Sequence, residues 1–230
     1  MKKILKLRNW AILLAILIPL VLPATNVLAD EAAVSGKLIN GYRVLSVDPA
    51  AAKLHLNVYR GDYIKFAFPA SMGTPVLAIP DLSVKKKLSL GIAKAPYFKM
   101  KKAGLFTFSL GDLSGDITVM EYRQPNYREV RAKQAARLIQ ESKPLILDVR
   151  TKMEYAKGHI ENSILIPLQA LQARIEEISR YKNQEILVYC ATGNRSTVAS
   201  KIMIDSGFRK ITNMRYGIAD WARSNYPIIR

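Results

Sequence analysis

Cysteine is almost missing from this chain of 230 residues: Cys190 is the only one, and histidine occurs at only 2 positions. A single cysteine cannot form a disulfide within the chain, so internal cross-linking is excluded as a source of stability. The thiol is therefore either free and reactive or a link to another molecule. Hydrophobic residues make up 50% of the chain and charged residues 23%, which is typical of a globular rather than a disordered protein.

The chain also lacks a long hydrophobic run. The apolar run Trp10–Leu22 is shorter than the roughly 20 residues that a membrane-spanning helix needs. It follows four basic residues and precedes Val27-Leu28-Ala29, residues that are small or otherwise tolerated before a cleavage point. This order is typical of a secretory signal peptide. We expect residues 1–29 to direct export to the periplasm or the cell exterior, with membrane contact only if they remain as an uncleaved anchor. No cysteine lies near residue 29, so lipid attachment to a mature N-terminal cysteine is excluded.

Acidic residues are scarce, with 18 Asp and Glu against 35 Lys and Arg, which gives a formal net charge of +17. The excess is spread over the chain rather than gathered in a tail. A diffuse positive field favours small anionic substrates and acidic surfaces. Nucleic acid is the other usual partner of such charge. The expected export and the lack of a base-reading motif argue against nucleic acid here.

The region 30–122 is predicted to be an all-β sandwich. Its short segments alternate apolar and polar residues and are separated by Gly-Asp, Ala-Gly and proline breaks, a pattern typical of strands in a sandwich or barrel. The expected strands are Tyr42–Val47, Lys53–Tyr59, Tyr63–Phe68, Val76–Ile79, Leu105–Leu110 and Ile117–Tyr122.

The strand order and turn motifs of this region resemble a cupredoxin-like domain. The residues that carry the resemblance are Gly61-Asp62, Pro80-Asp81, 102–108 and 115–119. A copper centre in that fold needs two histidines and a cysteine, often with a methionine. The region contains only His55, no cysteine, and Ser109 about where the thiolate ligand is expected, so we predict no copper. Two roles are considered for this region: a docking module for a partner protein, or a lid over the cysteine.

The remainder of the chain alternates strands and helices. After a polar linker at 123–129, this alternation predicts a parallel sheet covered by helices on both faces. Functional sites in such sheets lie at the carboxyl ends of the strands. The expected strands are 145–148, 186–189 and 211–214, and the expected helices are 130–140, 152–155, 168–178, 194–206 and 218–224.

Cys190 directly follows one of these buried strands. Gly193 allows a tight turn, and Arg195 and Ser196 open the following helix. A loop that enters a helix N-terminus points backbone N–H groups at one spot and adds the positive end of the helix dipole. An anion is stabilised there, and the nucleophilic thiolate form of a cysteine is favoured. The segment therefore predicts a reactive cysteine that can hold and transfer an anionic group.

The region 130–230 resembles a rhodanese-homology (sulfurtransferase) domain over its whole length. Motif order and spacing both match, although Glu161-Asn162, Leu165 and Tyr216 depart from the usual family pattern. The matching motifs are Asp148-Val-Arg150, Glu154-Tyr155, Gly158-His-Ile160, Ile166-Pro167, Cys190-Ala-Thr-Gly-Asn-Arg195, Gly217 and Trp221.

This resemblance implies single-cysteine sulfur transfer without a metal or another cofactor. The Cys190 thiolate attacks the outer sulfur of thiosulfate, polysulfide or a related anion, and the resulting persulfide passes its sulfur to an acceptor. Because no second cysteine can resolve the persulfide, the acceptor must be external: cyanide, sulfite, a small thiol or a partner protein. Pre-aimed donors around a developing charge are usually the largest catalytic contribution. The expected substrate-binding residues are Ala191, Thr192, Gly193, Asn194, Arg195 and Ser196.

Four further residues are assigned a supporting role by the resemblance. Asp148 and Arg150 lie at a strand end, where substrate binding is one role, but we expect them to brace the neighbouring loop, with an Arg150–Glu154 ion pair at helical spacing. His159 is a tempting catalytic base, but the family uses this position to tie a loop through hydrogen bonds, as buried polar groups require. Arg195 is expected either to face the oxyanion of the donor or to orient the loop.

Two alternative functions remain open. One is a sulfane-sulfur carrier or sensor without enzymatic turnover, which docks to a partner through the β region. The other is a phosphatase or an arsenate-reductase-like enzyme. Related phosphatases separate Cys and Arg by five residues, whereas four separate Cys190 from Arg195, and this shorter loop fits a sulfur atom better than phosphate.

Overall fold

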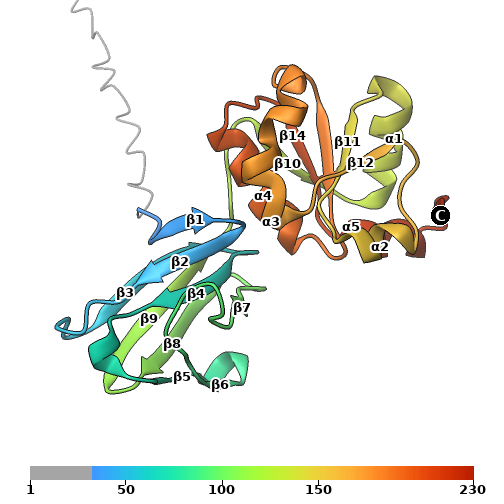
Figure 1. Cartoon of the computed structure of the whole chain (residues 1–230). Coiled ribbons are helices and arrows are strands. Elements are labelled where there is room, and N and C mark those ends of the chain that lie inside the picture. The colour runs from blue at the N-terminus through green and yellow to red at the C-terminus, as the bar shows by residue number, and fades with distance from the viewer. Residues whose placement is uncertain (1–32) are drawn as a thin grey trace, which may run out of the picture. The chain divides into compact units, whose positions relative to one another are not determined.

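The computed structural model describes residues 33–230, which belong to one compact unit (Figure 1). The expected signal peptide, residues 1–29, lies outside the described residues. Among residues 33–230, no helix has the length and apolar character needed to cross a membrane.

The segment up to residue 122, called the β region below, consists of two β-sheets. One sheet has the order β1-β2-β4-β7 and the other β3-β9-β8-β5-β6. The pairs β2–β4 and β3–β9 are parallel, and the other pairs are antiparallel. The strands are β1 (Lys37–Ile39), β2 (Tyr42–Ser46), β3 (Leu54–Tyr59), β4 (Tyr63–Ala67), β5 (Val76–Ile79), β6 (Val84–Lys87), β7 (Phe98–Lys99), β8 (Gly104–Leu110) and β9 (Leu113–Met120), with 3-10 turns at Ala70–Met72 and Pro80–Leu82.

Both sheets contribute to one hydrophobic core. Side chains alternate across a strand, so Leu54, Leu56 and Val58 of β3 are buried while the residues between them are more exposed. Ile64 and Phe66 of β4 reach the same core from the other sheet. The expected strands are thus confirmed as β2, β3, β4, β5, β8 and β9, and the two sheets agree with an all-β region. The cupredoxin-like resemblance itself stays a prediction.

The rest of the chain, called the α/β region below, contains one five-stranded parallel sheet with the order β10-β14-β13-β11-β12. Its strands are β10 (Tyr127–Val130), β11 (Leu145–Asp148), β12 (Ser163–Leu165), β13 (Ile186–Tyr189) and β14 (Ile211–Met214). Its helices are α1 (Ala132–Ser142), α2 (Lys152–Ala156), α3 (Leu168–Arg174), α4 (Asn194–Asp205) and α5 (Gly217–Arg223), with a 3-10 helix at Ile175–Tyr181.

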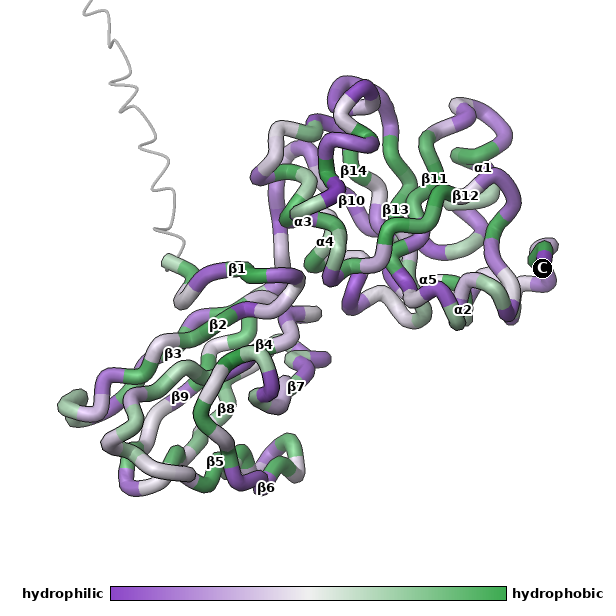
Figure 2. Tube along the Cα trace, viewed as in Figure 1, coloured by the Kyte–Doolittle hydropathy of each residue, from purple (hydrophilic) through white to green (hydrophobic). Residues whose placement is uncertain are grey.

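Helices cover both faces of this sheet, as the sequence predicts. Along β13, Ile186 and Val188 pack into the cluster that contains α3 and α4, whereas Leu187 and Tyr189 pack into the cluster that contains α1 and α5. Strands buried on both faces are continuous apolar runs. Figure 2 shows this in the green stretches of β11 and β13.

Several boundaries differ from the sequence prediction, and three of them have a clear cause. The expected linker 123–129 ends in β10, whose register beside β14 is set by pairing across the sheet rather than by a local apolar pattern. The helix expected from residue 130 begins later, at Ala132, because residue 130 belongs to β10. At the start of this helix the backbone N–H of Arg131 donates a hydrogen bond to the Gln134 side chain. The helix expected over 168–178 ends at Arg174 and tightens into the 3-10 helix.

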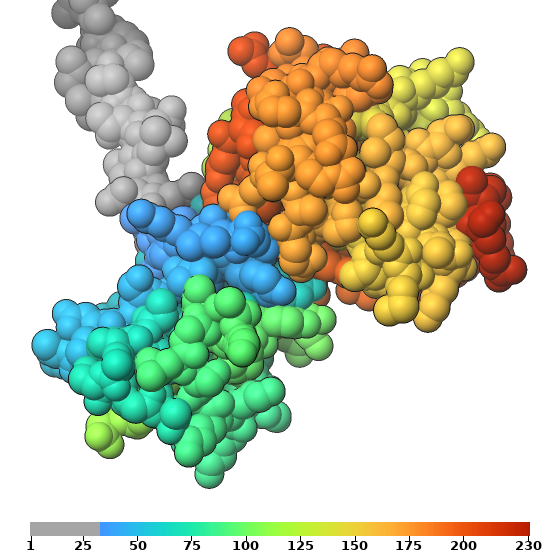
Figure 3. Space-filling model, viewed as in Figure 1, coloured from blue at the N-terminus to red at the C-terminus, as the bar shows by residue number. Residues whose placement is uncertain are grey.

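The C-terminal residues lie against the segment that follows α2. His159 and Ile229 form an antiparallel β-bridge, with N–H to O distances of 2.9 and 3.0 Å. Figure 3 shows the red C-terminal end covering the yellow surface at this place. A side chain at Gly158 would come within 2.6 Å of Ile228, so the close approach of the two segments requires glycine there.

Candidate functional site

Cys190 lies immediately beyond the carboxyl end of β13, and only 1% of its surface is exposed. The backbone N–H of Gly193 donates a hydrogen bond to its Sγ at 3.1 Å. The hydroxyl of Ser196 lies 3.6 Å from the same sulfur and 3.0 Å from the carbonyl oxygen of Gly193. Two of the expected loop donors therefore meet at the sulfur, and the Ser196 hydroxyl can turn to it when the sulfur carries charge.

Gly193 is the residue before the first turn of α4, and its conformation shapes the loop. Its φ of 96° is in the left-handed region, and a Cβ built on it would lie 1.4 Å from the carbonyl oxygen of Arg215. Its own carbonyl accepts bonds from the backbone N–H and the hydroxyl of Thr197 at 3.2 and 2.9 Å. Only glycine fits this position.

The start of α5 holds the other side of the loop. The backbone N–H groups of Ile218 and Ala219 donate to the carbonyl oxygens of Cys190 and Ala191 at 2.8 and 3.2 Å. A Cβ at Gly217 would lie 2.1 Å from the Cys190 oxygen, so this glycine permits the contact. The cysteine loop is thus clamped between the N-termini of two helices.

Arg195 is bound to Glu154 rather than left free. Its two terminal nitrogens donate to the two carboxylate oxygens at 2.7 and 2.6 Å, a bidentate pair. The expected Arg150–Glu154 pair is therefore wrong. Helical spacing favoured that pair, but Glu154 opens α2 in a capping box with Thr151, which turns its carboxylate toward the cysteine loop. Of the two roles considered for Arg195, this contact matches orientation of the loop.

Arg150 pairs with the buried Asp148 at the end of β11. Its guanidinium donates to the carboxylate at 2.6 to 3.0 Å, its backbone N–H donates at 2.8 Å, and it also reaches the carbonyl of Gly158 at 2.8 Å. Asp148 is 0% exposed and Arg150 5% exposed. The pair joins the end of β11 to the turn before β12.

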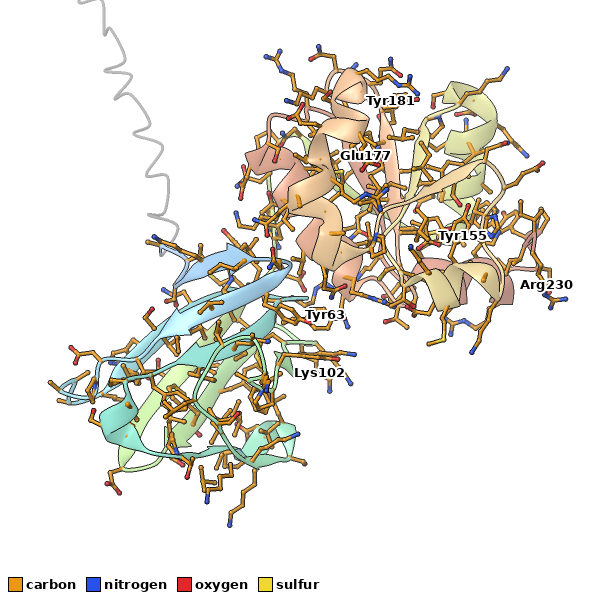
Figure 4. The ribbon with its side chains drawn as sticks, in the orientation of Figure 1. Tyr63, Lys102, Tyr155, Glu177, Tyr181 and Arg230 are labelled. Carbon is orange, nitrogen blue, oxygen red and sulfur yellow. The ribbon has the colours of Figure 1, made fainter. Side chains whose placement is uncertain are left out.

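His159 makes local contacts. Its Nδ1 lies 3.1 Å from the carbonyl oxygen of Tyr155, and the two rings stack at 3.7 Å between centroids. Tyr155, labelled in Figure 4, in turn donates its hydroxyl to the carbonyl of Ser163 at 2.7 Å. Together with the Ile229 bridge, these contacts hold the loop in place, which is a structural role rather than that of a catalytic base.

The other two loop residues line a pocket beside the cysteine loop. Thr192 is exposed and Asn194 half-buried, and the pocket measures about 320 Å³. Three basic side chains contribute to its wall. The complete lining is Arg60, Lys101, Thr192, Asn194, Arg215 and Tyr216.

Comparison with known proteins identifies the fold family. A model of the rhodanese-like domain matches residues 131–224. A protein named sulfurtransferase from Allochromatium vinosum is 34% identical over 85 residues, which span 37% of this chain and 78% of that protein. This chain belongs to the rhodanese-like family. The resemblance expected over about 130–230 is confirmed, and the family match begins beyond the β region.

Two other matches to this rhodanese-like chain differ in how much of each protein they cover. YrkF of Bacillus subtilis, named as a candidate sulfur carrier, is 41% identical over 76 residues, which are 33% of this chain and 40% of that protein. A solved rhodanese-related protein from Thermoplasma volcanium is 30% identical with a TM-score of 0.40, covering 45% of this chain and 98% of that one. The chain thus spans less than half of YrkF, although it spans most of the other two.

The Glu154–Arg195 pair predicts a pH dependence of stability. The hydrogen bond from Arg195 lowers the pKa of Glu154 from 4.5 to about 2. A carboxylate with a depressed pKa stabilises the folded state above its unfolded pKa, and that contribution is lost as the pH falls through the folded value. Between pH 4.5 and about 2, we therefore expect the unfolding free energy to fall more steeply in wild type than in Glu154→Gln. Urea denaturation at a series of pH values measures the slope.

Glu176→Gln is the control for this experiment. Glu176 is exposed and forms no ion pair within the described part of the chain, so its variant should keep the wild-type slope. Equal slopes for wild type and Glu154→Gln would contradict the assigned pairing.

The sequence offered a lid over the cysteine as one of two roles for the β region, but it did not indicate which residues of that region lie near Cys190. Tyr63 of β4 belongs to the same buried cluster as Cys190, and Gly61 lies against the start of α4. No sequence signal was available, because Lys65 interrupts the apolar run of β4, whereas in the structure Tyr63, Ile64, Lys65 and Phe66 are buried in succession.

Proposed function

We propose that this rhodanese-like chain is a sulfurtransferase in which Cys190 carries sulfane sulfur as a persulfide. The observation that carries the proposal is the hydrogen bond from the Gly193 N–H to Sγ at 3.1 Å, at the N-terminus of α4. Donors fixed in advance around a sulfur favour the anionic states that sulfur transfer passes through. The formal net charge of +17 also favours an anionic donor such as thiosulfate.

The first step loads the cysteine. The Cys190 thiolate attacks the outer sulfur of thiosulfate, an S–S bond forms at Sγ, and the S–S bond of thiosulfate breaks. Sulfite leaves with the electron pair, and the persulfide keeps the negative charge of the thiolate, so charge and electrons balance. Gly193 and Ser196 donate to the sulfur during this step, while Glu154 keeps the Arg195 guanidinium in place at the loop.

The second step returns the enzyme to its starting state. An external nucleophile such as cyanide attacks the outer sulfur of the persulfide, a C–S bond forms, and the S–S bond breaks. The electron pair returns to Sγ, so the thiolate is restored and thiocyanate is released. Sulfite or a small thiol takes the sulfur in the same way, because Cys190 has no second cysteine in the chain to resolve the persulfide.

Intact-mass measurement with thiosulfate, together with cyanide-dependent thiocyanate release, tests the proposal. Wild type is expected to gain one sulfur atom and to turn over. Cys190→Ser should show neither, because a hydroxyl is not ionised near neutral pH and forms no persulfide. A thermal melt shows whether the variant is folded, which is expected since serine is nearly the size of cysteine. If neither thiosulfate, polysulfide nor mercaptopyruvate loads wild type, the proposal is overturned.

A sulfur carrier without turnover is the second candidate. Its support is the 1% exposure of Cys190, which shields a bound sulfur from solvent, and the match to YrkF. Stable loading with negligible thiocyanate release would favour the carrier. Hydrolysis of an aryl phosphate that is lost in Cys190→Ser would instead favour a phosphatase.

The proposal also includes export directed by residues 1–29 and a cupredoxin-like β region that holds no copper. Export is supported by the basic segment and apolar run at the N-terminus. The lack of copper is supported by the donor set: His55 is the only histidine of the β region, and its ring is paired with Asp116 at 3.0 Å. Reading the N-terminus of the exported protein and measuring its copper content test both points.

A further inference from the structure

The turn between β3 and β4 packs directly on the start of α4. A Cβ at Gly61 would lie 3.0 Å from the carbonyl oxygen of Asn194 and 3.1 Å from Cβ of Thr197. The preceding Arg60 donates to Glu129 of β10 at 2.6 Å, so an ion pair also ties this turn to the parallel sheet. The β region therefore contacts the helix whose N-terminus faces Cys190.

Tyr63 follows this turn and opens β4 (Figure 4). Its neighbour Ile64 packs into the core of the β region, whereas Tyr63 packs into the cluster that contains Cys190. Only 6% of the tyrosine is exposed, and its ring lies 5.4 Å from the ring of Tyr97 and 5.3 Å from Nζ of Lys99. The side chain is thus held firmly on the cysteine side of β4.

The hydroxyl of Tyr63 is a donor with no protein acceptor among the described residues. Within residues 33–230, none of the hydrogen bonds involves this hydroxyl. Burial raises the pKa of Tyr63, and the electrostatic interaction with Cys190 raises it further, so the hydroxyl keeps its proton. The buried side-chain atoms that lack a partner in the described part of the chain are on Arg43 and Asn213, so the Tyr63 hydroxyl is not fully closed off from solvent and is free to donate to a ligand.

A persulfide at Cys190 supplies the missing acceptor. The S–S bond places the outer sulfur about 2 Å beyond Sγ. The negative charge lies on that outer sulfur, while Gly193 and Ser196 donate to Sγ itself. We infer that Tyr63, supplied by the β region, binds the transferred sulfur by donating its hydroxyl to the outer sulfur of the Cys190 persulfide.

This inference rests on the proposed function and adds a residue to its site. The rhodanese-like match begins at residue 131, so Tyr63 is a feature of this chain's own β region. The hydroxyl stabilises the loaded state, so its removal acts on loading by thiosulfate and on the lifetime of the persulfide.

Tyr63→Phe tests the inference in the full-length protein, because it removes the hydroxyl and keeps the ring. Tyr97→Phe is the matched control: the same change in the neighbouring ring, which is 46% exposed. Intact mass gives the loaded fraction at each thiosulfate concentration and its decay after the donor is removed. A hydrogen bond to a charged group accounts for about tenfold or more in an equilibrium. Tyr63→Phe should therefore need about tenfold more thiosulfate for half-loading and lose its sulfur correspondingly faster.

Three outcomes are distinguishable. Weakened loading in Tyr63→Phe with wild-type loading in Tyr97→Phe, and unchanged melting temperatures in both, supports the inference. Loading and decay in Tyr63→Phe equal to wild type overturn the inference and leave the proposed function standing. A wild type that takes up no sulfur from any donor overturns the proposed function and the inference with it.

Discussion

Gly193→Ala is expected to reduce sulfur loading at Cys190 by about a hundredfold or more, because a misplacement of about 1 Å has that effect on reactive geometry. The added Cβ would lie 1.4 Å from the Arg215 carbonyl oxygen, so the loop or the end of β14 must move. Any such movement displaces the Gly193 N–H from Sγ. It also disturbs the Gly193 carbonyl, which accepts from Ser196 and Thr197.

Gly207→Ala separates this collision from simple backbone strain. Gly207 lies two residues beyond the end of α4 with φ of 90°, close to the 96° of Gly193, but a Cβ there meets nothing within 4 Å. Left-handed backbone costs an alanine roughly 1–2 kcal/mol, so the control should lose that much stability and keep normal loading. Intact mass with thiosulfate and urea denaturation give the two readouts. Normal loading in Gly193→Ala would show that the loop tolerates a side chain and that its described geometry is wrong.

Asp148→Ala is expected to destabilise the protein by about 3–5 kcal/mol, because it leaves the Arg150 guanidinium buried without its counter-charge. Domains are stable by roughly 5–15 kcal/mol in total, so the loss is a large share of that stability. Asp148 is 0% exposed, and its carboxylate also accepts the backbone N–H of Arg150 at 2.8 Å. Urea denaturation measures the change.

Two further variants show whether burial is the cause. The double variant Asp148→Ala/Arg150→Met should recover part of the loss, because it leaves no unpaired charge inside the protein. Glu141→Ala removes an ion pair of the same 2.6 Å length to Arg137, but both side chains are more than half exposed, and stability should stay close to wild type. Equal losses for Asp148→Ala and Glu141→Ala would contradict a burial effect.

Secondary structure was predictable for segments whose own apolar side chains are buried. The strands 145–148, 186–189 and 211–214 are short apolar runs between turn signals, and the structure has them with the same bounds as β11, β13 and β14. Two of the missed strands show the difference. Lys37–Ile39 has mostly exposed side chains, and Tyr127–Val130 is at best half-buried. These segments are strands because a neighbour offers hydrogen bonds, and a local pattern does not carry that information.

Side-chain pairing was less predictable than position. Arg150 and Glu154 have the spacing of a helical ion pair, yet each binds another partner: Arg150 takes Asp148, and Glu154 takes Arg195. Arg150 precedes α2 rather than lying within it, so helical spacing does not apply. The partner of Glu154 lies 41 positions along the chain, and such a contact arises only when the sheet brings two strand ends together.

The sequence by itself determined the parallel α/β region, the rhodanese-like family and the position of Cys190 between a buried strand and a helix N-terminus. These features follow from local apolar periodicity and from motif spacing, both of which are properties of the sequence itself. Only the tertiary structure decided that Glu154 holds Arg195, that the start of α5 clamps the cysteine loop, and that Tyr63 shares the buried cluster of Cys190. The physical reason is that these contacts join segments distant in sequence, and the folding of both sheets brings those segments together.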